Sequence, residues 1–130
     1  MSIRRPHTAS ALNRLVSPPI DRGQLLRACG EDRALAQQLL YDMESILKSQ
    51  IKRIIQHAVD DDFCIAAETA HSLKGAAAIL GAEPLRLAAC AVERAAKMKN
   101  KVNLQAAAVD IRAAARTLIE FIPKVFTVSA

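Results

Sequence analysis

Aromatic residues are scarce in this sequence of 130 residues, which has no tryptophan, one tyrosine and three phenylalanines. Strands are enriched in aromatic and β-branched residues, whereas alanine, which is abundant here, has the highest helix propensity. Small side chains also let helices pack closely. The composition therefore predicts an all-helical protein.

Cysteine is equally scarce, and its pattern excludes a disulfide framework. Cys29, Cys64 and Cys90 are odd in number and widely spaced, with no C-x-x-C pair and no secretory leader. We expect three reduced cysteines that serve as small core residues in a cytosolic protein.

Two further absences narrow the function. No apolar run approaches the ~18 residues needed to cross a bilayer, so we expect no direct membrane insertion. The sequence also lacks a G-x-x-x-x-G-K-[ST] loop and a kinase-type glycine loop. We therefore expect no autokinase activity from ATP and no enzyme of that class.

The charge distribution separates a leader from a folded domain. The net charge is +5, and Arg4, Arg5 and Arg14 lie in an acid-free segment before Asp21. Without interleaved aromatics this basic segment is a poor nucleic-acid footprint, so we expect no nucleic-acid partner. We interpret residues 1–20 as a flexible or loosely docked leader, 21–126 as one domain and 127–130 as a tail.

Capping residues and apolar spacing predict the first two helices. Asp21 and Gln24 have capping-box spacing, which predicts a short helix from about Arg22 to Cys29 that Gly30 ends. Asp32 is the expected cap of a long helix over about 33–59. Its expected apolar stripe is Leu35, Leu39, Met43, Ile46, Leu47, Ile51, Ile54 and Ile55.

Three more helices are expected after this one. The acidic residues 60–62 suit the start of a helix that Gly81 ends, and Pro84 suits the first turn of the next. Asn103 is the expected cap of a last helix, which Pro123 stops. The expected apolar side of the penultimate helix is Leu85, Leu87, Ala88, Ala91, Val92, Ala95 and Met98. Short connections favour an up-and-down antiparallel four-helix bundle with a short additional N-terminal helix.

The third of these helices carries a histidine in an arrangement that suits nucleophilic chemistry. His71, Lys74 and Gly75 share one side, opposite the apolar positions Ala66, Ala70, Leu73, Ala77 and Leu80. A neutral imidazole has a lone pair that can attack phosphorus, and a cation one turn away would neutralise phosphoryl oxygens. Glycine costs about 1 kcal/mol relative to alanine inside a helix, so Gly75 suggests a need for space.

The stretch 70–82, A-H-S-L-K-G-A-A-A-I-L-G-A, resembles the signature of histidine-containing phosphotransfer (HPt) domains of two-component phosphorelays. The resemblance extends over nearly the whole chain from Asp21 onward. It implies that His71 accepts a phosphoryl group from a receiver-domain aspartate and passes it to another receiver, with Lys74 stabilising charge and Gly75 giving access. The sequence departs from the family pattern at Met43, where many relatives have phenylalanine, and at 76–78, where some have small hydroxyl residues.

The same resemblance implies partners and a setting. Partners would be receiver domains of response regulators or hybrid sensor histidine kinases, and magnesium would be supplied by the receiver, with no cofactor or metal of the chain's own. We expect a monomeric, cytoplasmic protein of bacterial-type signalling. The receiver-docking residues implied are Gln37, Gln38, Asp42, Glu68, Ser72 and Ala78.

Other interpretations stay open at this point. The same surface would serve a non-transferring helical adaptor that binds a receiver or kinase, and the chain could be a fragment of a hybrid kinase. His7 and His57 lack a companion lysine and glycine, and we interpret both as structural. Residues 57–64 hold a loose group of potential metal ligands without metal-binding spacing. Cys64 lies two turns, about 10 Å, before His71, too far for a direct hydrogen bond. The lysines at 97, 99 and 101 are expected to form a solvated turn or to steer an acidic partner.

Overall fold

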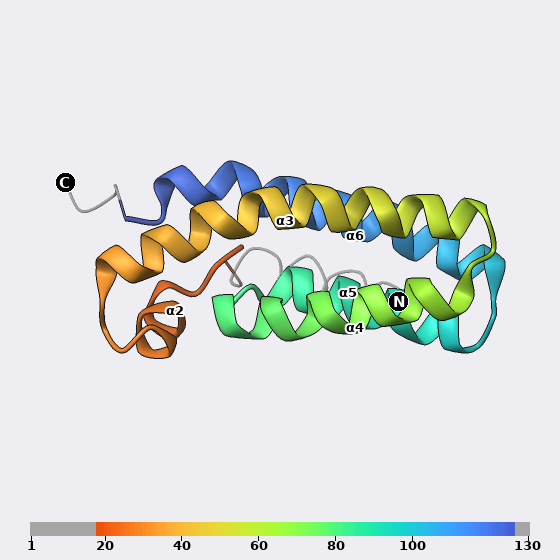
Figure 1. The fold of residues 1–130 in the computed structure, drawn as a ribbon, viewed down its shortest axis with the longest axis horizontal. Helices are drawn as coiled ribbons and strands as arrows, with labels where there is room; N and C mark the ends of the chain where they lie inside the picture. The colour runs from red at the N-terminus through yellow and green to blue at the C-terminus, as the bar shows by residue number, and fades with distance from the viewer. Residues whose placement is uncertain (1–17, 127–130) are drawn as a thin grey trace, which may run out of the picture.

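The computed structural model describes residues 18–126, and within them every regular element is helical. This confirms the all-helical prediction for the described residues. Residues 1–17 of the leader expected over 1–20, and the tail expected at 127–130, lie outside them. The helices are α2 (Arg22–Ala28), α3 (Arg33–Val59), α4 (Phe63–Leu80), α5 (Glu83–Lys97) and α6 (Lys101–Phe121), followed by the 3-10 turn η1 (Ile122–Lys124) (Figure 1).

Two predicted caps are present, and one was misplaced. Asp21 accepts a hydrogen bond from the Gln24 backbone N–H at 3.1 Å, and Asp32 accepts one from Leu35 at 3.0 Å. The last helix begins earlier than expected, because its cap is Asn100 and not Asn103. The Asn100 side chain accepts from the Asn103 N–H at 3.0 Å. Asp62 occupies the N-cap position of α4 but makes no side-chain capping bond.

The four long helices of the described chain enclose one core. α3 packs against α4 and α6, and α5 packs against α4 and α6, so each helix has two neighbours in the set (Figure 1). Met43 is 8% exposed and fills the core as expected. The largest fully buried side chains are Leu25, Leu40, Leu47, Ile54, Leu73, Leu80, Leu85, Val92, Leu104, Ile111 and Leu118. None of the helices in residues 18–126 combines the length and apolar character that a membrane span requires.

Some residues expected in the core are exposed. Leu87 is 54% exposed because the buried stripe of α5 runs through Leu85, Ala89 and Val92, and a residue two positions from Leu85 points the other way. Met98 is exposed because it caps α5 at the turn. The cysteines are all free, but Cys64 is exposed, which corrects its assignment to the core. The other apolar positions that proved exposed are Leu35, Ile46 and Ala91.

The short helix α2 is fastened to the C-terminal end of α4. The Asp21 N–H donates to the Gly81 carbonyl at 2.7 Å, and the Gln24 side-chain amide donates to the Ala78 carbonyl at 2.8 Å. Gly81 has φ +67°, and a Cβ there would lie 2.9 Å from the Asp21 carbonyl oxygen. Ile20, which we placed in the leader, is 2% exposed and belongs to the core. Glycine is therefore required at position 81 both by backbone conformation and by close packing.

Candidate functional site

Helix α4 presents His71 to solvent. Its buried side is formed by the apolar positions that the sequence pattern predicted, and the His71 side chain is 68% exposed. A side chain so placed is open to a macromolecular partner. The burial pattern of α4 therefore confirms that the imidazole faces away from the core.

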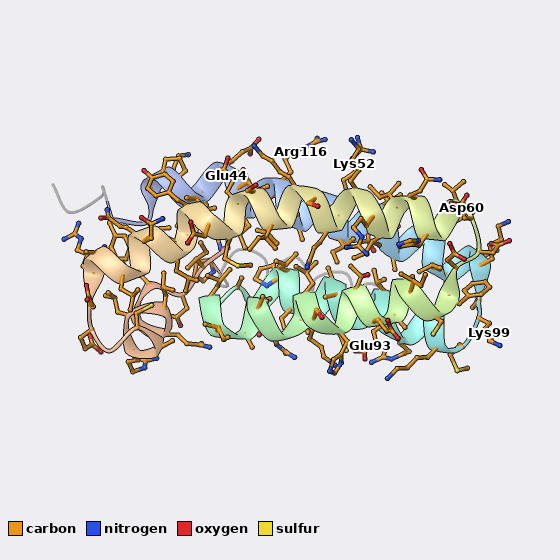
Figure 2. All side chains as sticks on the ribbon, viewed as in Figure 1. Glu44, Lys52, Asp60, Glu93, Lys99 and Arg116 are labelled. Atoms are coloured by element: carbon orange, nitrogen blue, oxygen red, sulfur yellow. The ribbon has the colours of Figure 1, made fainter. Side chains whose placement is uncertain are left out.

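A buried carboxylate from the neighbouring helix binds this imidazole. Glu93 of α5 places Oε2 at 2.9 Å from His71 Nδ1, and its Oε1 accepts a hydrogen bond from Lys74 Nζ at 2.7 Å. Lys97 Nζ lies 3.1 Å from Oε2. Among the described residues Glu93 is the one buried charged side chain, at 5% exposure. Figure 2 places it on the side of the bundle formed by α4 and α5. The tight packing of α4 on α5 thus joins two helices in one polar cluster.

The electrostatics of the cluster determine which imidazole nitrogen is available. The hydrogen bond from Lys74 lowers the pKa of Glu93 to about 2, with smaller contributions from Lys97 and His71, and outweighs the effect of burial. Glu93 is therefore ionised at neutral pH and can only accept hydrogen bonds. In neutral His71 the proton must then sit on Nδ1 and be donated to Glu93, which leaves the lone pair on Nε2.

Lys74 lies on the same side of α4 as His71, and its side chain is bound to the neighbouring helix. The Lys74 side chain is 30% exposed, and its ammonium binds Oε1 of Glu93, the carboxylate whose Oε2 binds His71. Lysine and histidine are therefore arranged side by side through Glu93. A long, flexible side chain in this position can reach an anion placed near His71 after exchanging part of its contact with the carboxylate.

Gly75 lies one turn after His71, and the protein's own packing does not require it. A Cβ at this position would have no heavy atom within 4 Å, and the residue is in the middle of α4. Glycine in a helix interior costs about 1 kcal/mol relative to alanine, and no contact inside the protein compensates for this cost. The space beside Gly75 lies on the outer surface of α4. Ile79, one turn further on, is 54% exposed and extends this surface with an apolar side chain.

The residues expected to dock a receiver fall into two groups. Glu68, Ser72 and Ala78 are exposed on the histidine helix itself. Gln37, Gln38 and Asp42 are also exposed, but on the N-terminal half of α3. Because α3 and α4 meet at the turn 60–62, His71 lies level with about residue 51, roughly 20 Å along the axis from Gln38. Only the first group therefore shares the histidine helix, and the docking role of both groups stays a prediction.

Sequence reasoning missed Glu93 and Ile79, and it assigned Lys97 to a solvated turn or to an acidic partner and not to this cluster. A signal for Glu93 is present in the sequence, because it falls on the stripe of α5 that includes the buried Ala89 and Ala96. An acid at a core position requires partners, and Lys97 one turn later is one of them. Its pairing with His71 depends on how α4 and α5 align, which the spacing within one helix does not reveal.

The other residues considered for chemistry do not form a comparable cluster. His57 Nδ1 lies 3.5 Å from Asp62 Oδ2, and its side chain is mostly buried. Lys101 pairs with Asp61 at 3.3 Å across the turns that join the helices. Residues 18–126 contain no group of three or more His, Cys, Asp or Glu side chains placed to hold a metal ion.

Comparison with known proteins identifies a family and a similar fold. The family model described as "Hpt domain" matches residues 22–122. The chain is also similar to the crystal structure of a rice protein assigned as a histidine-containing phosphotransfer protein. That similarity has a TM-score of 0.56 and 14% identity, and covers 95% of this chain and 96% of the rice chain. At this identity the likeness concerns the fold. No protein in the curated set matches the chain.

Proposed function

The chain belongs to the Hpt domain family, and from this premise we propose that it is a phosphoryl carrier of a two-component phosphorelay. His71 accepts the phosphoryl group from an aspartyl phosphate of one receiver domain and passes it to the aspartate of another. The observation that carries this proposal is an exposed imidazole whose Nδ1 is bound to an ionised, buried carboxylate, Glu93.

The reaction follows from the tautomer that Glu93 selects. The Nε2 lone pair attacks phosphorus, the N–P bond forms, and the P–O bond to the receiver aspartate breaks, so that the aspartate leaves as a carboxylate. His71 keeps its Nδ1 proton and becomes a cationic phosphoimidazole, which Glu93 stabilises at 2.9 Å. In the return step an aspartate oxygen of the next receiver attacks phosphorus, and the electron pair of the N–P bond returns to Nε2.

Lys74 and Gly75 have supporting roles in this proposal. Lys74 turns from Glu93 towards the phosphoryl oxygens and offsets charge that spreads over them in a loose transition state. Gly75 leaves the outer surface of α4 open to the phosphoryl group and to the receiver. We place the receiver over Glu68, Ser72 and Ala78, with Ile79 as an apolar contact, and we retain the α3 residues Gln37, Gln38 and Asp42 as an outer rim.

The proposal includes a division of labour between the two proteins. Magnesium belongs to the acidic pocket of the receiver, and the carrier contributes the nucleophile and no nucleotide-binding loop. We therefore propose a carrier without autokinase activity, with no cofactor of its own. The packing order of α3 to α6 supports an up-and-down antiparallel four-helix bundle with α2 as a short addition. A cytoplasmic monomer in bacterial-type signalling is the setting we propose.

A non-transferring adaptor is the competing function, because an exposed helix surface can bind a receiver without chemistry. The test is to incubate the full chain with a panel of phosphorylated receiver domains and magnesium, and to map phosphate by intact mass and peptide analysis. We expect acid-labile, base-stable phosphate on His71. His71→Gln should abolish labelling and keep the helical circular dichroism spectrum, whereas His57→Gln and His7→Gln should retain labelling. Binding without transfer would establish the adaptor instead.

A further inference from the structure

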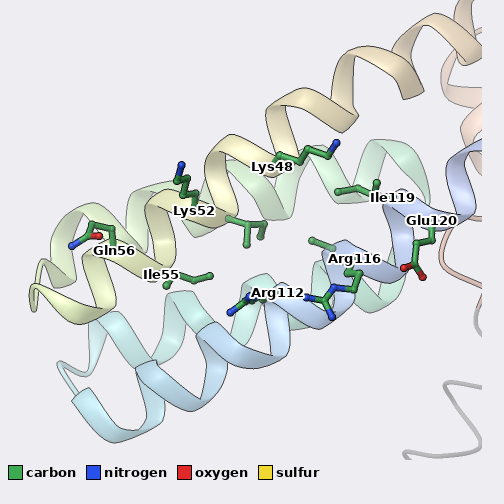
Figure 3. Close-up of a pocket in the computed structure, with 10 residues that line it drawn as sticks. Lys48, Lys52, Ile55, Gln56, Arg112, Arg116, Ile119 and Glu120 are labelled. Carbon is green, nitrogen blue, oxygen red and sulfur yellow. The ribbon is translucent and has the colours of Figure 1, made fainter.

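A second surface of the protein, remote from His71, has the features of a binding groove. A groove of about 640 Å³ runs between α3 and α6, with an apolar floor of Ile51, Ile55 and Ile119 (Figure 3). Lys52 and Arg116, at this groove, lie on the opposite side of the bundle from Glu93 (Figure 2). A ligand here would leave the histidine accessible.

The rim of this α3–α6 groove is strongly basic. Lys48, Lys52, Arg112 and Arg116 line it, against a single acid, Glu120. Lys48 is paired with Glu44 at 3.1 Å. The remaining three cations make no ion pair with any residue in the described part of the chain. The groove therefore presents a net positive charge over an apolar floor.

The groove continues towards the turn that joins α3 to α4. A smaller hollow of about 210 Å³ shares Ile55 and Arg112 with it and is lined by Val59 and Val109, which are 61% and 67% exposed. From Lys48 to Val59 the combined groove spans about 16 Å, or three helical turns. This length suits a short helix, whose apolar residues at i, i+3, i+4 and i+7 would lie on the floor.

We propose that the α3–α6 groove docks an acidic amphipathic helix of a partner protein. The apolar side of such a helix would cover the isoleucine and valine floor, and its carboxylates would meet Lys52, Arg112 and Arg116. A second copy of this chain would bring like charges together, and the acid-free leader with Arg4, Arg5 and Arg14 would do the same. Nucleic acid offers no counterpart to the apolar floor, and no aromatic side chain lines the groove for base stacking.

The test uses the full chain and synthetic helical peptides. A panel of fluorescein-labelled peptides would have leucine at i, i+3, i+4 and i+7 in several registers, with glutamate on the other side. Matched peptides would have lysine for glutamate. We expect the acidic peptides to raise fluorescence anisotropy on binding, the lysine peptides to bind at least tenfold more weakly, and the affinity to fall with added salt.

Charge reversal locates the site. The double variant Arg112→Glu and Arg116→Glu should weaken the acidic peptides at least tenfold, whereas the control Arg27→Glu and Arg94→Glu, both exposed and outside the groove, should change affinity less than twofold. Backbone amide NMR shifts should be confined to α3 and α6. His71→Gln should leave peptide binding unchanged, so failure of the phosphorelay proposal would not affect this readout.

Several results would overturn the proposal. These are equal binding of the lysine peptides, shifts that map to α4 and α5, or no binding by any acidic peptide. Binding of anionic phosphatidylserine vesicles or a DNA duplex through the same arginines, without peptide binding, would reassign the groove to a membrane or nucleic acid. A dimer in sedimentation that the Arg112 and Arg116 variant abolishes would reassign it to a second copy of the chain.

Discussion

His71 and Glu93 are bound to each other across two helices, with Nδ1 of the imidazole 2.9 Å from Oε2 of the carboxylate. The imidazole is mostly exposed, whereas the carboxylate is almost completely buried. A fixed anion beneath an accessible ring orients the ring and makes one nitrogen the nucleophile. Replacing His71 tests whether this residue accepts the phosphoryl group. Replacing Glu93 tests whether the carboxylate orients and activates the imidazole.

Glu93→Gln should slow phosphoryl transfer to His71 while leaving the site in place. Glutamine keeps the shape but not the charge that stabilises the cationic phosphoimidazole, so we expect a rate about tenfold lower, equivalent to about 1.4 kcal/mol. Stopped-flow transfer from one phosphorylated receiver would measure it, with Glu120→Gln as the exposed control. An undiminished rate in the Glu93 variant would show that the carboxylate serves stability alone. The ¹⁵N shifts of the His71 ring would report the tautomer independently.

The stability of the protein should depend on pH through Glu93. The carboxyl has an ordinary pKa of 4.5 when unfolded and about 2 when folded, so its contribution is complete above pH 4.5 and is lost as the pH falls to about 2. The difference corresponds to about 3 kcal/mol. Urea unfolding of the wild type and Glu93→Gln at several pH values should give curves that converge in acid. A difference in the free energy of unfolding between the two proteins that stays constant from pH 6 to 2 would contradict this assignment.

Comparison of Lys74→Ala with Lys97→Ala should distinguish a lysine that assists phosphoryl transfer from one that only forms a salt bridge with Glu93. Both lysines bind Glu93, at 2.7 Å and 3.1 Å, but only Lys74 is on the histidine helix. We expect Lys74→Ala to reduce the transfer rate about tenfold and Lys97→Ala to reduce it less than twofold, since a cation one turn from the imidazole can follow the phosphoryl group. Transfer rates with one receiver and urea midpoints would be measured for both. Equal rates would make Lys74 a structural partner of Glu93 only.

Gly75→Ala should raise stability and lower transfer. The added methyl group meets nothing within 4 Å, and alanine in a helix interior is favoured by about 0.5–1 kcal/mol. If the open surface admits the receiver, the same methyl group should reduce the transfer rate or weaken receiver binding. Denaturation and transfer are measured on the same preparation. A more stable variant with unchanged transfer would remove access as the reason for this glycine.

Gly81→Ala should destabilise the junction between α2 and α4. The residue has φ +67°, and the new Cβ would be forced against the Asp21 carbonyl, so we expect a loss of about 2–3 kcal/mol. Gly30→Ala is the matched control, because Gly30 has φ +64° but open space around it. It should lose only the conformational part, about 1 kcal/mol. Equal losses in thermal or urea unfolding would show that the close approach to Asp21 contributes little.

Local signals in the sequence predicted the elements well where a cap and a stripe coincided. Asp32 and the spacing after it gave the bounds of α3, and Gly81 ended α4 as expected. The prediction of Asn103 as the cap of α6 was wrong because Asn100, three residues earlier, offers the same capping side chain directly after the turn. Apolar identity alone also placed Leu87 in the core, although its angle on the helix points it to solvent.

The residues of the candidate site also differ in how far the sequence predicts their arrangement. His71, Lys74 and Gly75 lie within one turn of one helix, so their common side follows from helix geometry. Glu93 is separated from His71 by 22 positions and meets it only through the alignment of α4 with α5. Ala70 and Ala77 of α4 and Ala89 of α5 are buried in the core, where this alignment is set. Periodicity within each helix contains no information about it.

The fastening of Asp21 to Gly81 has a consequence for how the molecule can be linked to others. At the other end of the described chain, the Phe126 carbonyl accepts a hydrogen bond from Arg33 at the start of α3, so both ends of the described chain lie at the same end of the bundle (Figure 1). That end is about 15 Å along α4 from His71. Any domain tethered there by a short linker would encounter the imidazole at a raised effective concentration.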